Sequence, residues 1–318
     1  MTKKEFSKLG FSLLISAISA NGASVAAQTL LENLLAGQTL TYASLVAFYI
    51  VFVLVALLCF NVLFKRGADV VAPDVGTKQK QKLSFIVIVG LFCLCMACSY
   101  IFNLIGIGTT WALSSIIYGR TTDMLNPVTN IMGDNILLSF LVVGLIAPVC
   151  EEFVFRKLLL DRLRPAGELA AILFCGLSFG LYHLNFTQFF YAAALGLIFA
   201  YITIKTGTIL YSSILHILIN TLSSTVMAQL ATKVSLATDP SLKVLYSMLV
   251  LSIMGIFIVG GVIFLAIIIS KKAIVIEKTD GVAAENKTTF SKAFLNVGVI
   301  LFTVCCLTAF VVLLGVQQ

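Results

Sequence analysis

Charged residues are scarce in this chain of 318 residues, of which 11% are Asp, Glu, Lys or Arg and 60% are hydrophobic. Soluble domains carry about 25% charged residues, so the composition excludes an ordinary soluble fold. The apolar segments also lack the regular polar–apolar alternation that the strands of a membrane β-barrel require. Because backbone polar groups in hydrocarbon must be satisfied within the segment itself, these segments are predicted to be helices.

Histidine is nearly absent, with two residues in the chain, and the H-E-x-x-H pattern of zinc proteases does not occur. The eight cysteines all lie in or beside apolar segments, without the spacing of a disulfide framework. On a helix, where successive residues are ~100° apart, Cys93, Cys95 and Cys98 would point in different directions. We therefore interpret the cysteines as small packing residues.

Apolar segments that can cross a hydrocarbon core of ~30 Å recur along the chain. The fold class is therefore all-α, a polytopic transmembrane helical bundle with about eight or nine spans. The candidate spans lie near residues 9–27, 43–64, 83–105, 135–155, 169–185, 188–204, 208–226, 244–270 and 293–315. We divide the chain into N-terminal spans with an outer loop, a motif-bearing catalytic core, and C-terminal spans. These regions are 1–134, 135–226 and 227–318.

The basic residues predict the orientation of this bundle. If every candidate span crosses, all 21 Lys and Arg residues except Arg120, Lys233 and Lys243 lie on one side of the membrane. The positive-inside rule makes that side the cytoplasm, where the N-terminus also lies. Membrane topology thus accounts for the net charge of +7, and we expect no nucleic-acid partner. The protein is predicted to be a multi-pass protein of the cell membrane.

Three further segments have local signals. Basic residues followed by an apolar stretch that ends in Ala23-Ser24-Val25-Ala26-Ala27 resemble a signal peptide, but we expect a retained first span, because the later spans supply insertion signals. Residues 106–134 are predicted to form the longest outer loop, with the sole tryptophan, Trp111, at the membrane interface. Residues 271–292 are charged and are predicted to form an inner loop.

Ionisable side chains inside apolar spans are costly and usually mark function. Glu152 and Arg156 stand at i and i+4 with the acid first, which predicts a helical ion pair. Glu151 diverges from Glu152 by ~100° on a helix, so the two carboxylates should have different roles, with Glu151 the freer one. Pro148 lacks a backbone donor and is expected to loosen the preceding turn.

The two histidines, His183 and His216, both fall in candidate spans, and His216 shares a helix face with Asn220 at i and i+4. A single histidine in a span is more often a hydrogen-bond partner between helices than a catalyst. However, a rise of ~1.5 Å per residue from the predicted cytoplasmic ends places Glu151, His183 and His216 near the middle of the membrane. Together with the Asn220 carboxamide they would form a group able to activate water.

Three motifs follow one another in this region: Glu151-Glu152-x-x-x-Arg156, Phe179-x-x-x-His183 and His216-x-x-x-Asn220. Together they resemble the CPBP family of intramembrane proteases, over roughly residues 135–226. This family includes the eukaryotic CAAX prenyl endopeptidase and many bacterial relatives linked to bacteriocin self-immunity or peptide maturation. The resemblance implies a bacterial membrane enzyme whose partners are the lipid bilayer and a membrane peptide or prepeptide substrate.

The resemblance also implies roles for residues. Glu151 would be the general base for a water that His183 also holds, and His216 and Asn220 would stabilise the oxyanion. Glu152, Arg156 and Phe179 would support these groups. In an alternative version His183, His216 and either Glu151 or Glu152 would bind Zn²⁺.

Two hypotheses of other classes remain open. The chain could be a non-catalytic immunity factor or scaffold that binds a peptide or a membrane protein partner. It could also be a transporter whose buried glutamates and histidines relay protons, although no paired broken helices in corresponding halves of the chain support that reading.

Overall fold

The computed structural model describes residues 1–64, 81–119, 135–276 and 290–316, and every regular element in these ranges is helical. The predicted all-α fold is thereby confirmed. Within these ranges eight helices are long and apolar enough to cross a membrane. They are α1 (Lys3–Leu31), α2 (Gly37–Leu63), α3 (Phe85–Tyr118), a composite segment Ile136–Ala166, α9 (Phe186–Thr206), a second composite segment Leu210–Leu236, α12 (Pro240–Ser270) and α14 (Val297–Val316).

The apolar helix α8 (Glu168–Leu181) is shorter than these eight, because its 14 residues rise only ~21 Å. The predicted span 169–185 is therefore wrong in its length. Helix α9 returns to the side from which α8 starts, since Lys205 near the end of α9 pairs with Glu168 at the start of α8. The chain leaves α8 at Tyr182, and Leu184 adopts the left-handed conformation with φ 58°. Asn185 then caps α9 by accepting a hydrogen bond from the Gln188 backbone N–H. Helices α8 and α9 therefore form a hairpin whose turn contains His183.

Both composite segments contain π-helical turns. The first consists of α5 (Ile136–Ser139), η1 (Phe140–Ile146), α6 (Ala147–Glu152), η2 (Phe153–Leu159), α7 (Leu160–Leu163) and η3 (Arg164–Ala166), of which η1 and η2 are π-helices and η3 is a 3₁₀ turn. The second consists of α10 (Leu210–Thr221), the π-helix η4 (Leu222–Met227) and α11 (Ala228–Leu236). Helical π-turns widen the backbone spiral and frequently occur at functional sites.

The loop predicted for residues 106–134 is wrong over its first part, because α3 remains helical to Tyr118 and ends at Gly119, which has φ 66°. No proline interrupts residues 106–118, and the loop signals Gly119 and Asn126-Pro127 come later. Trp111 is half-exposed on this helix. The rest of the predicted outer loop lies outside the described residues. In the predicted inner loop, residues 273–276 are irregular and the chain is helical again from Phe290.

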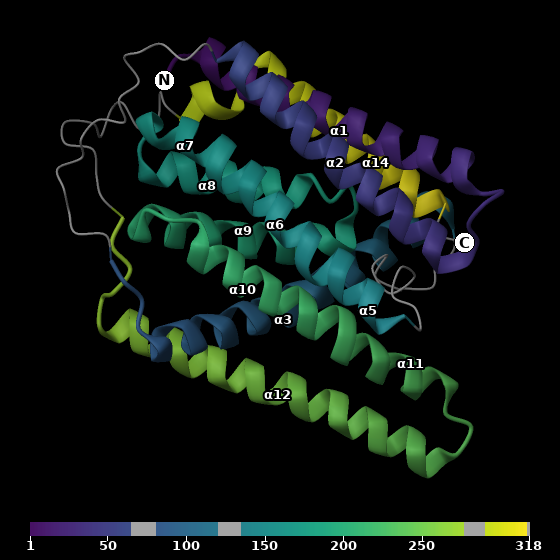
Figure 1. Cartoon of the computed structure of the whole chain (residues 1–318). Coiled ribbons are helices and arrows are strands. Elements are labelled where there is room, and N and C mark those ends of the chain that lie inside the picture. The colour runs from purple at the N-terminus through teal and green to yellow at the C-terminus, as the bar shows by residue number, and fades with distance from the viewer. Residues whose placement is uncertain (65–80, 120–134, 277–289, 317–318) are drawn as a thin grey trace.

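The helices are arranged in three groups in Figure 1. Helix α1 packs against α2 and α14 on one side, α8 packs against α9 in the middle, and α3 joins α9 to the peripheral helix α12. Gly10 of α1 and Gly298 of α14 let these two helices approach so closely that a Cβ atom on either would overlap the other backbone. The N-terminus lies at the end of the bundle that contains α7, and the C-terminus lies at the opposite end (Figure 1).

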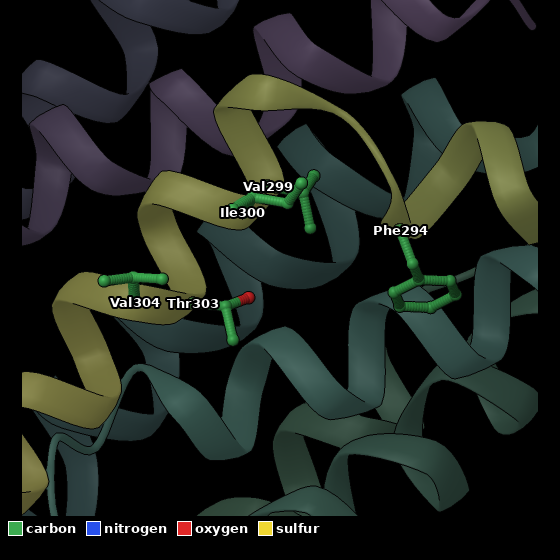
Figure 2. Close-up of a pocket in the computed structure, with 5 residues that line it drawn as sticks. All are labelled: Phe294, Val299, Ile300, Thr303 and Val304. Carbon is green, nitrogen blue, oxygen red and sulfur yellow. The ribbon is translucent and has the colours of Figure 1, made fainter.

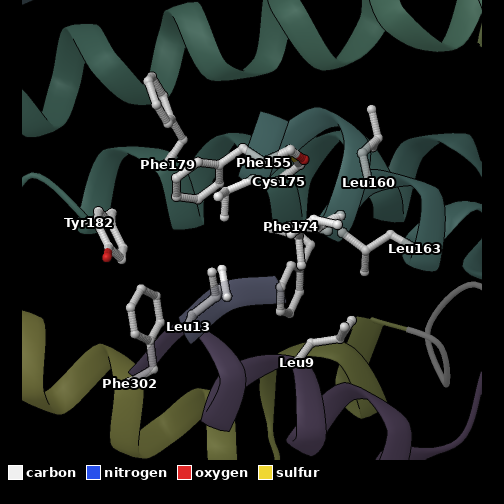
Figure 3. Close-up of a cluster of buried hydrophobic side chains, with 14 of the residues drawn as sticks. Leu9, Leu13, Phe155, Leu160, Leu163, Phe174, Cys175, Phe179, Tyr182 and Phe302 are labelled. Atoms are coloured by element: carbon white, nitrogen blue, oxygen red, sulfur yellow. The ribbon is translucent and has the colours of Figure 1, made fainter. Parts of the chain in front are cut away.

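A buried apolar cluster holds the middle of the bundle together (Figure 3). Leu9 and Leu13 of α1 and Phe302 of α14 face Phe174 of α8 and Phe155 of η2. All five side chains are at most 1% exposed, and close van der Waals packing of this kind is what holds helices together within a membrane. This cluster positions η2 and α8, which both carry residues of the predicted site.

Candidate functional site

Pro148 leaves a carbonyl of the π-helical turn η1 without a backbone donor. The Ala147 N–H bonds to the Val142 carbonyl, so the next residue along, Pro148, would have to supply the donor for the Val143 carbonyl. Proline has no N–H, and the Asn220 side chain fills the vacant position: its Nδ2 donates to the Val143 carbonyl at 3.2 Å. The loosened turn predicted before Pro148 is therefore present. Asn220, a residue of the third motif, donates to the Val143 carbonyl that has no backbone donor.

His216 lies between the two glutamates. Its Nδ1 is 3.1 Å from Oε1 of Glu152, and its Nε2 is 3.6 Å from Oε2 of Glu151. The side chains of His216 and Glu152 are 4% and 0% exposed, whereas that of Glu151 is 12% exposed. The two adjacent glutamates thus contact opposite nitrogens of the His216 ring. Of the two, only Glu151 has side-chain surface that a small molecule can reach.

The predicted ion pair between Glu152 and Arg156 is present, with 3.3 Å between Oε2 and Nε and both side chains fully buried. The Arg156 guanidinium also donates to Cys175 Sγ at 3.2 Å. Its central carbon lies 4.9 Å from the centre of the Phe179 ring and 5.7 Å from that of Phe199, within the range of cation–π attraction. Phe179, for which a supporting role was predicted, thus covers one face of this cation.

Tyr49 is a site residue that the sequence analysis missed. Its hydroxyl donates to Oε1 of Glu151 at 2.8 Å, across 102 positions of the chain. The residue belongs to α2, which packs against α6 and both π-helices of the Ile136–Ala166 segment. In the sequence it is one tyrosine within an apolar run, and no spacing links it to the three motifs.

His183 lies in the turn between α8 and α9, and not inside a membrane-spanning helix as predicted. Its Nδ1 is 2.9 Å from the Phe179 carbonyl oxygen, and its own carbonyl accepts a hydrogen bond from Asn185 at 2.7 Å. The ring packs edge-on against the Phe179 ring. Glu151 and His216 are both electrostatic neighbours of the imidazole, so the hairpin turn brings the second motif to the other two.

The proposed zinc ligands do not form a ligand set in this arrangement. Within the residues that the structure describes, no three His, Cys, Asp or Glu side chains are grouped as a metal ion would require. His216 Nδ1 faces Glu152, and His183 Nδ1 faces a backbone carbonyl. Glu152 is in addition paired with Arg156. Glu152 is thus committed to His216 and Arg156, and the described residues do not present the three grouped donors that a zinc ion requires.

A separate pocket lies away from this cluster, between α14 and the short helical turn before it (Figure 2). It has a volume of about 250 Å³ and is lined by Phe294, Val299, Ile300, Thr303 and Val304. Its lining contains no ionisable side chain, so it cannot supply a general acid or base. The candidate site is therefore the buried cluster around His216.

No curated protein and no solved structure matches the chain. Residues 133–222 match a family model described as Type II CAAX prenyl endopeptidase Rce1-like. The match begins before Pro148, ends just after Asn220 and contains all three motifs, whereas Tyr49 lies outside it. The family is one of proteases, and the resemblance to the CPBP family that the motifs indicated is confirmed for this segment. The Glu–His–Glu cluster therefore lies within the segment of this multi-pass membrane protein that is similar to the Rce1-like family.

Proposed function

We propose that this protein is an intramembrane endopeptidase that hydrolyses membrane-associated or lipid-anchored peptides at the cluster around His216. The observation that carries this proposal is the imidazole held between Glu151 and Glu152 inside the bundle. It lies within the segment that matches a prenyl endopeptidase family. Buried ionisable groups are costly in a membrane, and such a group of them is expected to serve chemistry.

In this mechanism Glu151 is the general base. It is the one carboxylate of the pair with exposed surface, and it is not used in the Arg156 ion pair. Glu151 takes a proton from a water molecule while the water oxygen bonds to the carbonyl carbon of the substrate peptide. The C–N bond then breaks, and Glu151 returns the proton to the leaving amine. The products are a carboxylic acid and a free amine, and water is the only co-reactant.

Other residues would orient the water and stabilise the oxyanion. His183 uses Nδ1 on the Phe179 carbonyl, which leaves Nε2 to hold the attacking water. Asn220 uses one N–H on Val143 and has a second for the oxyanion. His216, whose Nδ1 faces Glu152, would donate to the oxyanion from Nε2. Preorganised donors of this kind typically contribute ~10²–10³-fold to kcat.

The experiment is cleavage of a panel of membrane-anchored peptides, with and without a prenyl group, by the purified protein in liposomes. We expect cleavage by the native chain, and a loss of at least ~10²-fold in the Glu151→Gln and His183→Ala variants. Glu32→Gln makes the same carboxylate-to-amide change at the exposed end of α1 and should retain full activity. Mass spectrometry identifies the bond that is cut.

The same panel distinguishes the binding hypothesis. If no peptide is cleaved while the Glu151→Gln variant still captures a peptide or membrane protein, the protein is a scaffold or immunity factor. A chelator added to the native enzyme tests the glutamate mechanism against the zinc version, since the mechanism above predicts unchanged cleavage.

A further inference from the structure

The Tyr49 hydroxyl contacts the proposed general base, Glu151, but has no role in the mechanism described above. The hydroxyl donates to Oε1 of Glu151 at 2.8 Å, while Oε2 of the same carboxylate faces His216 at 3.6 Å. Both oxygens of the general base therefore have a fixed neighbour, one from α2 and one from α10. Rotation of the carboxylate about its last side-chain bond would break one of these contacts.

Helix α2 holds Tyr49 firmly. Phe52, one turn further along α2, is fully buried and packs against Tyr182 and Phe155, with ring centroids 4.8 Å and 6.3 Å apart. Tyr182 lies at the start of the hairpin turn, and Phe155 lies in η2. The same helix packs along α1 over much of its length. The position of the Tyr49 hydroxyl is thus fixed by the aromatic contacts that also position the Glu151 and His183 segments.

We propose that Tyr49 is a positioning residue of the protease, and that its hydroxyl holds the Glu151 carboxylate in the rotamer from which it takes the proton of the attacking water. This proposal rests on the proposed function. It adds to the proposed active site a residue from outside the family match, because α2 lies outside residues 133–222. Tyr49 does not touch the substrate in this role and acts only through Glu151.

The test compares two tyrosine-to-phenylalanine changes on α2. Tyr49→Phe removes one oxygen atom and keeps the ring. Tyr42→Phe is the matched control, since Tyr42 lies on the same helix, is 2% exposed and has a buried hydroxyl with no hydrogen-bond partner among the described residues. We expect Tyr49→Phe to lower kcat by about 10–10²-fold with KM changed less than about twofold, because the base is misplaced while binding is kept. Tyr42→Phe should leave both constants unchanged.

A thermal-stability cycle tests the contact without any activity measurement. Tyr49→Phe should lower the Tm of the native chain and leave that of the Glu151→Ala variant unchanged, because alanine removes the acceptor. An equal Tm shift in both backgrounds would overturn the contact itself.

The remaining outcomes separate the two proposals. If the native chain and Tyr42→Phe cleave peptide and Tyr49→Phe does so with the native kcat, the positioning role is wrong and the proposed function stands. A fall in kcat accompanied by an equal proportional change in KM would also overturn the role, since it would indicate altered substrate binding. If the native chain cleaves nothing, the proposed function and the positioning role are both overturned.

Discussion

At the residue scale, the Glu152–Arg156 pair is the feature with the largest expected energetic effect. Both side chains are fully buried, and the two charges neutralise one another. Arg156→Met should therefore destabilise the protein by about 3–5 kcal/mol, because it leaves a buried carboxylate without its cation. Unfolding of the purified protein in mixed detergent micelles measures this change.

Two comparisons show whether the cost comes from the stranded charge. Adding Glu152→Gln to Arg156→Met should restore part of the lost stability, because no uncompensated carboxylate then remains. Lys157→Met breaks the neighbouring pair with Asp161, whose lysine is 60% exposed, and should change stability by less than about 1 kcal/mol. A loss from Arg156→Met no greater than that from Lys157→Met would contradict the buried-pair account.

The sequence predicts part of this site and not the rest, for physical reasons. Glu152 and Arg156 are one helical turn apart, so their contact follows from local geometry alone. The contact of Tyr49 with Glu151 crosses 102 positions and depends on how α2 packs, which no local periodicity encodes. For the same reason the sequence predicts Glu151 to be the freer carboxylate but does not predict its contacts with Tyr49 on α2 and His216 on α10.

At the element scale, the π-helical turn η1 makes a testable link between Pro148 and Asn220. Asn220→Leu should cost about 1–3 kcal/mol, because the Val143 carbonyl then lacks a donor in a partly buried environment. Pro148→Ala restores a backbone N–H near this carbonyl, so the cost of Asn220→Leu should shrink in that background. Thermal unfolding measures the cost of Asn220→Leu in the native chain and in the Pro148→Ala variant. Equal costs would rule out this link between Pro148 and Asn220.

The α1–α14 crossing gives a second prediction at this scale. Gly298→Ala would push a methyl group into the Ser7 carbonyl oxygen on α1, so we expect a loss of about 1–3 kcal/mol. Gly255 of α12 is the matched control, because a Cβ atom there would meet nothing within 4 Å. Gly255→Ala should therefore be neutral or stabilise the helix by up to about 1 kcal/mol. Thermal unfolding of the two variants compares them directly.

The sequence predicts the helices well where hydrophobicity determines their position. It predicts them poorly where contacts between helices determine the local conformation. Long apolar runs gave the spans, because the membrane thickness sets their length. Hydrophobicity does not distinguish α from π turns, so η1, η2 and η4 were not predicted. Residues 169–185 are apolar enough to suggest a span, yet the chain turns at Tyr182–Leu184 to bring His183 to the site.

At the scale of the whole molecule, basic residues gather at the end of the bundle that contains the N-terminus. Lys8 donates to the Leu63 carbonyl at 2.8 Å, Arg162 donates to that of Phe60 at 3.1 Å, and Lys205 pairs with Glu168 at 2.7 Å. Two of the three exceptions, Lys233 and Lys243, lie beside the α11–α12 turn at the opposite end (Figure 1), and the third, Arg120, lies outside the described residues. This distribution favours a cytoplasmic N-terminus.

A cysteine placed at each end of α12 tests that orientation. In intact cells, a membrane-impermeant maleimide should label Ser241→Cys and should label Ser270→Cys only after the membrane is opened. The native chain, whose one exposed cysteine, Cys305, lies in the middle of the apolar helix α14, should remain unlabelled. The reverse pattern would place the N-terminus outside.

The position of the Glu152–Arg156 pair within one helix also bears on how the protein is inserted into the membrane. A single charged residue at the centre of a span costs about 2.5–3.5 kcal/mol at insertion. Glu152 and Arg156 can neutralise each other as soon as their segment is helical, before any other helix packs. Glu151 has no such partner in its own helix. Helix α2 precedes it in the chain and α10 follows it, so during synthesis Tyr49 is the first of its two observed partners to reach the bilayer.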